Sequence, residues 1–399
     1  MSERRYDIDW LRVLAIVFVF LYHCVQIFRP GEGYVVNNSE LTTIVDFPLS
    51  LLDMIIMANI FLLSGAGTWY ALGSRSSLQY LWERAARLLI PLYTVGMCVL
   101  LPISNYLWLR TNAGYQGSFW EMLPSYFAEV GDFYPLPSGL VPVPYPGHLW
   151  FLQFLFLTSI LTLPLLRYLR TERGLHFIDL LAGWCHRRGG LLLLLVPVLL
   201  IRVCLSNVPG LSGYNAWTEF IEYMVYFLIG YILPADPRFS EGIKRQGWIC
   251  LVTGLIGFVL IMLAIYKLGY VFYDEPFSLR FVLFQALYSL ARCSWVIFIL
   301  SLGMKYLNFN NKALTYGNEA VLPFYILHEP IVVLVGWFVI SWNLAIISKL
   351  LIIIPASFAV SMILYDLIIR RLNVVRFLFG MRPKKKQPAV PAHSEGAAA

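Results

Sequence analysis

Long apolar runs separated by short polar connections dominate the chain from residue 9 to residue 369. Each run has about 18 to 25 residues, which is long enough to cross a bilayer as an α-helix. About ten such runs are present, near residues 9–29, 50–72, 88–109, 148–168, 190–206, 216–234, 247–268, 281–304, 317–340 and 346–369. The pattern predicts an all-α, polytopic integral membrane protein with about ten transmembrane helices.

The composition points the same way, because 59% of the residues are hydrophobic and only 13% are charged. In soluble domains charged residues make up about a quarter. Most of the 30 Lys and Arg residues lie near the chain ends and in alternate connections. By the positive-inside rule, this distribution predicts that both termini are cytoplasmic. The net charge of +7 then reflects topology, and no nucleic-acid partner is expected.

Residues 1–381 are predicted to form one transmembrane domain, and the Lys-, Pro- and Ala-rich residues 382–399 a disordered cytoplasmic tail. The longest connection, residues 110–147, combines prolines, aromatic side chains and acidic residues. It is either a platform on which a sugar stacks or an interfacial aromatic belt with a proline-stiffened linker. The six cysteines are scattered, so neither a disulfide framework nor a metal site is predicted, and no bound cofactor is expected.

Two ionisable residues occupy one face of the first apolar run. Arg12 and His23 are eleven positions apart, so a helix places them on the same face with ~16 Å between them along its axis. Ionisable groups are costly at such depth and usually face a polar cavity. The spacing predicts one elongated ligand, anionic at Arg12 and reactive at His23, where a neutral imidazole can act as general base. The alternative for His23 is a hydrogen bond between packed helices.

His328 lies in the ninth run, two residues before Pro330. A proline inside a span frees a backbone carbonyl one turn earlier, and such breaks often lie beside binding cavities. His328 is therefore either catalytic or part of a structural kink, at a depth similar to that of His23. His148 and Trp150 open the fourth run at the predicted outer surface. They are either substrate-binding residues or interface anchors.

Arg292 lies well inside the eighth run, where an unpaired guanidinium is costly. It therefore needs an anionic ligand or a carboxylate. Glu219 and Glu222, one turn apart in the sixth run, are candidate partners for Arg292 or for Arg202. Arg202 is shallower, and its side chain is expected to be able to reach outward to the membrane surface.

Small residues surround Ser64 in the second run, where they are expected to allow close helix packing. Arg84 and Arg87 enter the third run from the predicted cytoplasmic side. They are either plain positive-inside anchors or, together with Arg12, a cradle for phosphates.

Five motifs taken together resemble the acyltransferase 3 family of membrane O-acyltransferases. They are Arg-x10-His in the first run, Phe-x-x-Ser-Gly at residues 61–65, Arg-x-x-Arg-x-x-x-Pro at residues 84–91, His-Leu-Trp-Phe-Leu at residues 148–152, and Tyr-Ile-Leu-His-Glu-Pro at residues 325–330. The second motif departs mildly from the family pattern, with Ile60 before Phe61 and Ala66 after the glycine. The resemblance covers nearly the whole transmembrane region.

The resemblance implies transfer of an acyl group, succinyl or acetyl, from cytoplasmic acyl-CoA to a hydroxyl of an extracytoplasmic glucan or another carbohydrate. It also implies a bacterial inner (plasma) membrane. By position, Arg12 and His23 match the family's essential pair, and Arg84 and Arg87 match its basic motif near the donor. The group that stabilises the oxyanion is left open by the sequence, with His328 and Ser64 as candidates. Direct transfer and an acyl-histidine relay are both compatible with these residues.

A transporter of a small anion or a lipid-linked metabolite is the alternative function, because buried Arg and His residues among many spans occur there too. The two functions differ in one product. An enzyme releases free CoA thiol when it is given acyl-CoA and an acceptor, whereas a carrier leaves the thioester intact.

Overall fold

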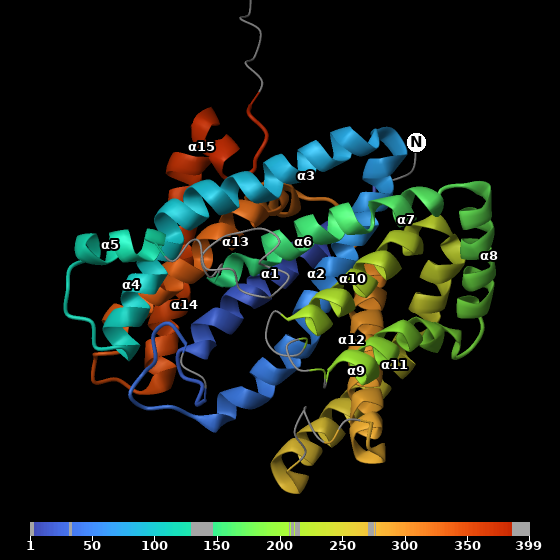
Figure 1. Cartoon of the computed structure of the whole chain (residues 1–399), viewed down its shortest axis with the longest axis horizontal. Helices are drawn as coiled ribbons and strands as arrows, with labels where there is room; N and C mark the ends of the chain where they lie inside the picture. The colour runs from blue at the N-terminus through green and yellow to red at the C-terminus, as the bar shows by residue number, and fades with distance from the viewer. Residues whose placement is uncertain are drawn as a thin grey trace, which may run out of the picture.

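The protein is described from a computed structural model, which covers residues 4–31, 34–128, 147–206, 208, 211, 216–269, 275 and 277–384. These residues form helices and connections without any strand, which confirms the all-α prediction (Figure 1). The predicted domain end at residue 381 stays a prediction, and residues 385–399 of the predicted tail lie outside the described residues.

The first half of the chain contains α1 (Tyr6–Gln26), η1 (Thr43–Val45), α2 (Asp46–Ser74), α3 (Ser77–Pro91), η2 (Leu92–Leu100), α4 (Leu101–Asn112), α5 (Phe119–Ala128), η5 (Gly147–Leu149), α6 (Trp150–Leu161), α7 (Leu163–Tyr168) and α8 (Glu172–His186). The second half contains η6 (Gly190–Leu194), α9 (Leu195–Leu205), α10 (Trp217–Ile232), η7 (Leu233–Ala235), α11 (Pro237–Leu268), α12 (Leu279–Tyr306), α13 (Lys312–Val339), α14 (Ile346–Leu364), η8 (Tyr365–Ile369) and α15 (Asn373–Leu378).

Seven helical stretches of the described chain are long and apolar enough to cross a bilayer. They are Tyr6–Gln26, Thr43–Ser74, Ser77–Asn112, Pro237–Lys267, Leu279–Tyr306, Lys312–Val339 and Ile346–Ile369. The other three predicted spans correspond to shorter helices, namely α6 with α7, η6 with α9, and α10. The count of ten spans and the cytoplasmic placement of both termini therefore remain predictions.

Polar side chains in the connections define where several helices begin. The side chains of Ser76, Asp236, Ser278 and Asn311 each accept a hydrogen bond from a backbone N–H in the first turn of the helix that follows. Such N-caps satisfy donors that the helix itself leaves free. The cap of α3 comes only two residues after α2 ends, so the chain turns there within a short connection.

Helices α2 and α10 approach each other closely through two glycines. A Cβ atom on Gly65 would collide with the backbone carbonyl of Phe227, and one on Gly230 would collide with that of Leu62. Only residues without a side chain permit such an approach. This packing confirms the interpretation of the small residues in the second apolar run.

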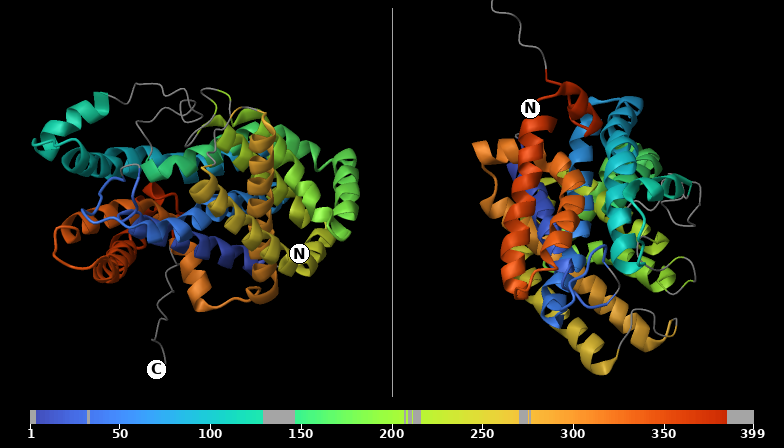
Figure 2. Two further views of the ribbon diagram at one scale, coloured as in Figure 1. Left: turned by 90° about the horizontal axis from the view of Figure 1, so that it is seen from below. Right: turned by 90° about the vertical axis from the view of Figure 1, so that its left-hand side faces the viewer.

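The helices that surround α1 come from distant parts of the sequence. Helix α1 packs on α2 and α13, and α13 in turn packs on α4 and α14 (Figures 1 and 2). Two irregularities lie in these neighbours. Pro91 is followed by the π-helical turns of η2, and α13 contains Pro323 and Pro330. π-Helical turns such as those of η2 frequently mark functional sites.

Candidate active site

Three imidazole rings from separate elements meet beside α1. The ring centroids of His23 (α1) and His328 (α13) are 5.2 Å apart, and those of His148 (η5) and His328 are 5.4 Å apart. The rings of His23 and His148 are 6.5 Å apart. The structure therefore brings together three histidines that the sequence separates by up to 305 positions, since His23 and His328 are the outermost two. We call these three residues the histidine cluster.

Pro330 explains how His148 enters this cluster. Proline has no N–H, so the carbonyl oxygen of Ile326, one turn earlier in α13, has no helical donor. The Nε2 atom of His148 lies 3.1 Å from that oxygen and supplies the missing hydrogen bond. The hydroxyl of Tyr325 donates to the backbone carbonyl of His148. The carbonyl that Pro330 leaves without a helical donor is thus a contact point for a residue from another element.

His148 is buried, and its second nitrogen faces a carboxylate. Nδ1 lies 3.2 Å from Oε2 of Glu329, which also accepts a hydrogen bond from Ser104 of α4 at 3.3 Å. A carbonyl oxygen can only accept, so the bond to Ile326 fixes a hydrogen on Nε2. Nδ1 thus faces the carboxylate at ion-pair distance, without the geometry of a hydrogen bond. The prediction of an outer-surface anchor is wrong for His148, because its side chain is buried against α13.

His328 is fully buried and has one free nitrogen. Its Nδ1 atom donates to the backbone oxygen of Tyr325 at 2.7 Å, again because a carbonyl only accepts. Its Nε2 atom has no hydrogen-bond partner within the described part of the chain. Neutral His328 therefore presents at Nε2 a lone pair that is available to accept a hydrogen bond from a ligand.

His23 is the most accessible member of the cluster, since its residue is half-buried while His328 is fully buried and His148 nearly so. Its Nδ1 atom lies 3.1 Å from the hydroxyl of Tyr34, a residue that no sequence motif marks. Partial exposure of this residue distinguishes it from the other two members of the cluster. The spacing of apolar and polar residues gives no indication of a functional role for Tyr34, Ser104 or Glu329. Glu329 is nevertheless next to His328 in the sequence.

Guanidinium groups gather toward the start of α1. The positive charges of Arg12, Arg84 and Arg87 are close enough to repel one another. Among the described residues, one carboxylate alone lies within ion-pair distance of any of them, that of Asp9, at 3.6 Å from Arg12 Nη1. The cluster therefore carries excess positive charge, and an anionic ligand would neutralise it. We call these three residues the basic cluster.

Ser64 belongs to the surroundings of the basic cluster. Arg84 donates to the backbone oxygen of Ser64 at 3.5 Å and to the hydroxyl of Thr68 at 2.7 Å. The guanidinium of Arg84 also lies over the ring of Tyr80, with 5.3 Å to the ring centroid. These contacts hold Arg84 against α2.

Arg292 forms a buried charge network of its own. Its Nη1 atom donates to Oε1 of Glu222 at 2.8 Å, and Arg202 donates to Oε2 of the same carboxylate at 3.0 Å. Glu222 is thus the partner of both arginines, as the sequence allowed. The expectation that Arg202 reaches outward is wrong, because its residue is only 7% exposed and it also binds Gln285 at 2.8 Å. The substrate-binding role predicted for Arg292 stays a prediction, since these contacts are internal.

Trp150 is also buried rather than interfacial. Its ring stacks on Tyr223 with centroids 5.8 Å apart and meets Phe154 edge-to-face at 5.0 Å. The interpretation of Trp150 as an interface anchor is therefore wrong. Part of the predicted sugar platform is helical, because α4 extends to Asn112 and α5 follows. Residues 129–146 of that platform lie outside the described residues.

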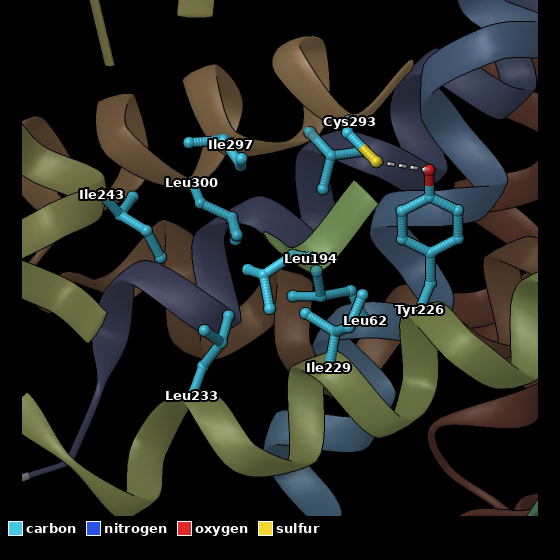
Figure 3. Close-up of a pocket in the computed structure, with 10 residues that line it drawn as sticks. Leu62, Leu194, Tyr226, Ile229, Leu233, Ile243, Cys293, Ile297 and Leu300 are labelled. Carbon is cyan, nitrogen blue, oxygen red and sulfur yellow. Dashed lines mark hydrogen bonds between the residues drawn. The ribbon is translucent and has the colours of Figure 1, made fainter. Parts of the chain in front are cut away.

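A small apolar crevice lies between α2, α10, α11 and α12 (Figure 3). Its polar groups are the Tyr226 hydroxyl and the Cys293 thiol, which bond to each other at 3.3 Å. No member of the histidine or basic cluster lines it. Within the described residues, no group of three or more His, Cys, Asp or Glu side chains is arranged to hold a metal ion.

A helical membrane protein that gathers imidazoles beside one part of α1 and guanidinium groups beside another fits a membrane enzyme with an anionic substrate. The chain belongs to the acyltransferase 3 family, because the family model, described as an acyltransferase domain, matches residues 5–366. It is thus an integral membrane acyltransferase.

Its relatives include two proteins named glucans biosynthesis protein C. One, from Escherichia coli O6:K15:H31 (strain 536 / UPEC), is 22% identical over 420 residues, and one from Escherichia coli (strain K12) is 21% identical over 416 residues. Each alignment covers 98% of both chains. No solved structure matches the chain.

Proposed function

We propose that this acyltransferase takes a succinyl or acetyl group from cytoplasmic acyl-CoA and transfers it to a hydroxyl of an extracytoplasmic glucan or another carbohydrate. The observation that carries the proposal is the layout of α1. Arg12 stands in the basic cluster and His23 in the histidine cluster, with ~16 Å of helix between them. A donor with a polyanionic head, a long arm and a thioester at its far end matches this layout.

The basic cluster supports the donor end of the proposal. CoA carries several phosphates, and guanidinium groups bind phosphate in a planar, two-pronged geometry. Arg12 is partly exposed and Arg87 exposed, so both are accessible to a ligand. Arg84 is anchored to Thr68 and can present its charge without moving. The acyl-CoA head would lie on these groups, at the side that the positive-inside pattern assigns to the cytoplasm.

The histidine cluster supports the reactive end. His23 Nε2 would remove the proton of the acceptor hydroxyl while the hydroxyl oxygen attacks the thioester carbon. The resulting tetrahedral intermediate collapses, the carbon–sulfur bond breaks, and the His23 imidazolium returns the proton to the departing thiolate. The products are an ester and free CoA thiol, and no other reactant is needed. An acyl group carried transiently on His23 would give the same products.

His328 fits a different role from the oxyanion donor suggested by the sequence. With Nδ1–H bonded to the Tyr325 oxygen, its free Nε2 accepts a hydrogen bond and suits a substrate hydroxyl better than an oxyanion. The Ser64 backbone is bonded to Arg84, which favours a place beside the donor head. Neither residue is therefore our choice for stabilising the oxyanion.

The choice of acceptor rests on the relatives. Proteins named glucans biosynthesis protein C match this chain along 98% of its length, so a glucan is the acceptor to test first. Relatives from Escherichia coli also favour the bacterial inner membrane as the location. A direct comparison of succinyl-CoA with acetyl-CoA as donors identifies the acyl group.

The test uses the full chain purified in lipid nanodiscs, radiolabelled succinyl-CoA or acetyl-CoA, and a soluble glucan. We expect label in the glucan together with an equal amount of free thiol. His23→Ala should abolish both signals, whereas His176→Ala, on the exposed face of α8, should leave both unchanged. Transfer by the His23→Ala protein would refute the assigned base. An intact thioester in the presence of wild-type protein and every acceptor would refute acyl-CoA as donor.

A further inference from the structure

Tyr34 contacts the half-buried imidazole of the histidine cluster. Its hydroxyl is 3.1 Å from His23 Nδ1, and the two rings are nearly parallel, with centroids 5.9 Å apart and an interplanar angle of 26°. Since Nδ1 faces a protein hydroxyl, Nε2 is the nitrogen left to meet a reactant. The protonation of Nε2 is therefore tied to what Tyr34 does at Nδ1.

The segment that carries Tyr34 is anchored at several points. The Asn112 side chain, at the end of α4, donates to the backbone oxygen of Tyr34 at 3.4 Å. Asn38 accepts a hydrogen bond from Nζ of Lys349, in the first turn of α14, at 2.7 Å. Between these points Val36 is fully buried against Val333 and Leu107. The ring position is thus set by three other parts of the fold and not by local flexibility.

A neutral imidazole has one hydrogen, so two arrangements are possible at this contact. If the Tyr34 hydroxyl donates to Nδ1, the hydrogen of His23 is on Nε2, which then cannot take a proton. If Nδ1–H donates to the Tyr34 oxygen, Nε2 keeps its lone pair and is a base. In the second arrangement the same hydrogen bond becomes stronger as His23 acquires positive charge, because its donor is then ionised.

We propose that Tyr34 is a positioning residue that holds His23 in the Nδ1–H tautomer, so that Nε2 is the base in acyl transfer. The proposal rests on the proposed function, which makes His23 the general base. It adds the group that selects the productive tautomer and stabilises the imidazolium formed during proton transfer. In other enzymes a partner on the second nitrogen of a histidine has this effect.

The first experiment is Tyr34→Phe, which removes the hydroxyl and keeps the ring that stacks on His23. We expect kcat to fall about tenfold to a hundredfold with the KM for acyl-CoA unchanged, because donor binding involves other residues. Tyr106→Phe is the matched control. Tyr106 packs in the same apolar group as Tyr34, and its hydroxyl bonds to the Gly117 oxygen, not to a histidine. The kcat of the Tyr106→Phe protein should stay within about twofold of wild type.

The second experiment reads the tautomer directly. Protein labelled with ¹⁵N at histidine is compared in nanodiscs with His23→Gln, whose missing signals identify His23. We expect Nδ1 of His23 to be protonated and Nε2 to be unprotonated in wild type, with this preference reduced in Tyr34→Phe. An unchanged kcat in Tyr34→Phe, or Nε2 protonated in wild type, would overturn the proposal. Failure of the proposed function looks different, because wild type itself would then release no CoA thiol.

Discussion

His148 Nδ1 lies 3.2 Å from Glu329 Oε2, in a region where both side chains are almost fully buried. The opposite nitrogen of His148 is committed to the Ile326 oxygen. The contact between η5 and α13 therefore depends on a buried imidazole that faces a buried carboxylate. Each group is the polar partner that makes burial of the other acceptable.

Removal of that carboxylate should destabilise the protein strongly. Glu329→Ala leaves a buried imidazole without its acidic partner and the Ser104 hydroxyl without its acceptor, so we expect a loss of about 3–5 kcal/mol. Glu329→Gln keeps the size and one hydrogen bond and should cost less. The unfolding temperatures of the two variants in nanodiscs measure which of them is less stable. A double-mutant cycle with His148→Ala should show coupling, and strictly additive effects would contradict a direct interaction between the two side chains.

The second buried charge group consists of Glu222, Arg202 and Arg292. The prediction for it concerns which substitution destabilises the protein most. Glu222 binds Arg202 and Arg292, so Glu222→Gln leaves two buried guanidinium groups without a carboxylate. Arg202→Gln or Arg292→Gln leaves Glu222 paired with the remaining arginine. We expect Glu222→Gln to lower the unfolding temperature more than either arginine variant, with about 3–5 kcal/mol lost. Equal effects of the three variants would contradict a shared carboxylate.

Much of the site could be predicted from sequence because the membrane makes polar residues conspicuous. Arg12 and His23 stand out in an apolar run at a spacing that fixes their relative position on one helix. His328 stands out in the same way, and Pro330 predicts the freed carbonyl beside it. The use of that carbonyl by His148 could not be predicted, since it depends on how η5 packs on α13.

Other residues escaped prediction because their roles arise only from tertiary contacts. Tyr34 lies in a connection, and a lone tyrosine near the end of a span is ordinarily an interface residue. Ser104 is a small polar residue in an apolar run, where packing alone accounts for it. Arg202 was misplaced because hydropathy gives depth along a span but not the partner on a neighbouring helix. The three short helices show the same limit, since apolar length alone does not fix where a helix breaks.

The glycines of α2 provide a matched pair for testing helix packing. Gly65→Ala places a methyl group against the backbone carbonyl of Phe227, which cannot move without displacing α10. We expect loss of folded protein or a large fall in unfolding temperature. Gly67→Ala meets nothing within 4 Å, and alanine is favoured over glycine inside a helix by roughly 0.5–1 kcal/mol. It should therefore be neutral or stabilising. Equal behaviour of the two variants would contradict the close contact between α2 and α10.

The basic cluster predicts a donor site whose affinity depends on salt. Arg12→Ala and Arg84→Ala should each raise the KM for acyl-CoA about tenfold or more with little change in kcat, since each removes a guanidinium that we propose binds phosphate in the ground state. Higher ionic strength should raise the wild-type KM, because it screens partly exposed charges. Arg188→Ala is the control, as Arg188 is an exposed arginine in the connection after α8. If it raises KM as much as Arg12→Ala, general surface charge attracts the donor. A KM that stays constant in Arg12→Ala would contradict the assignment of the phosphates to this cluster.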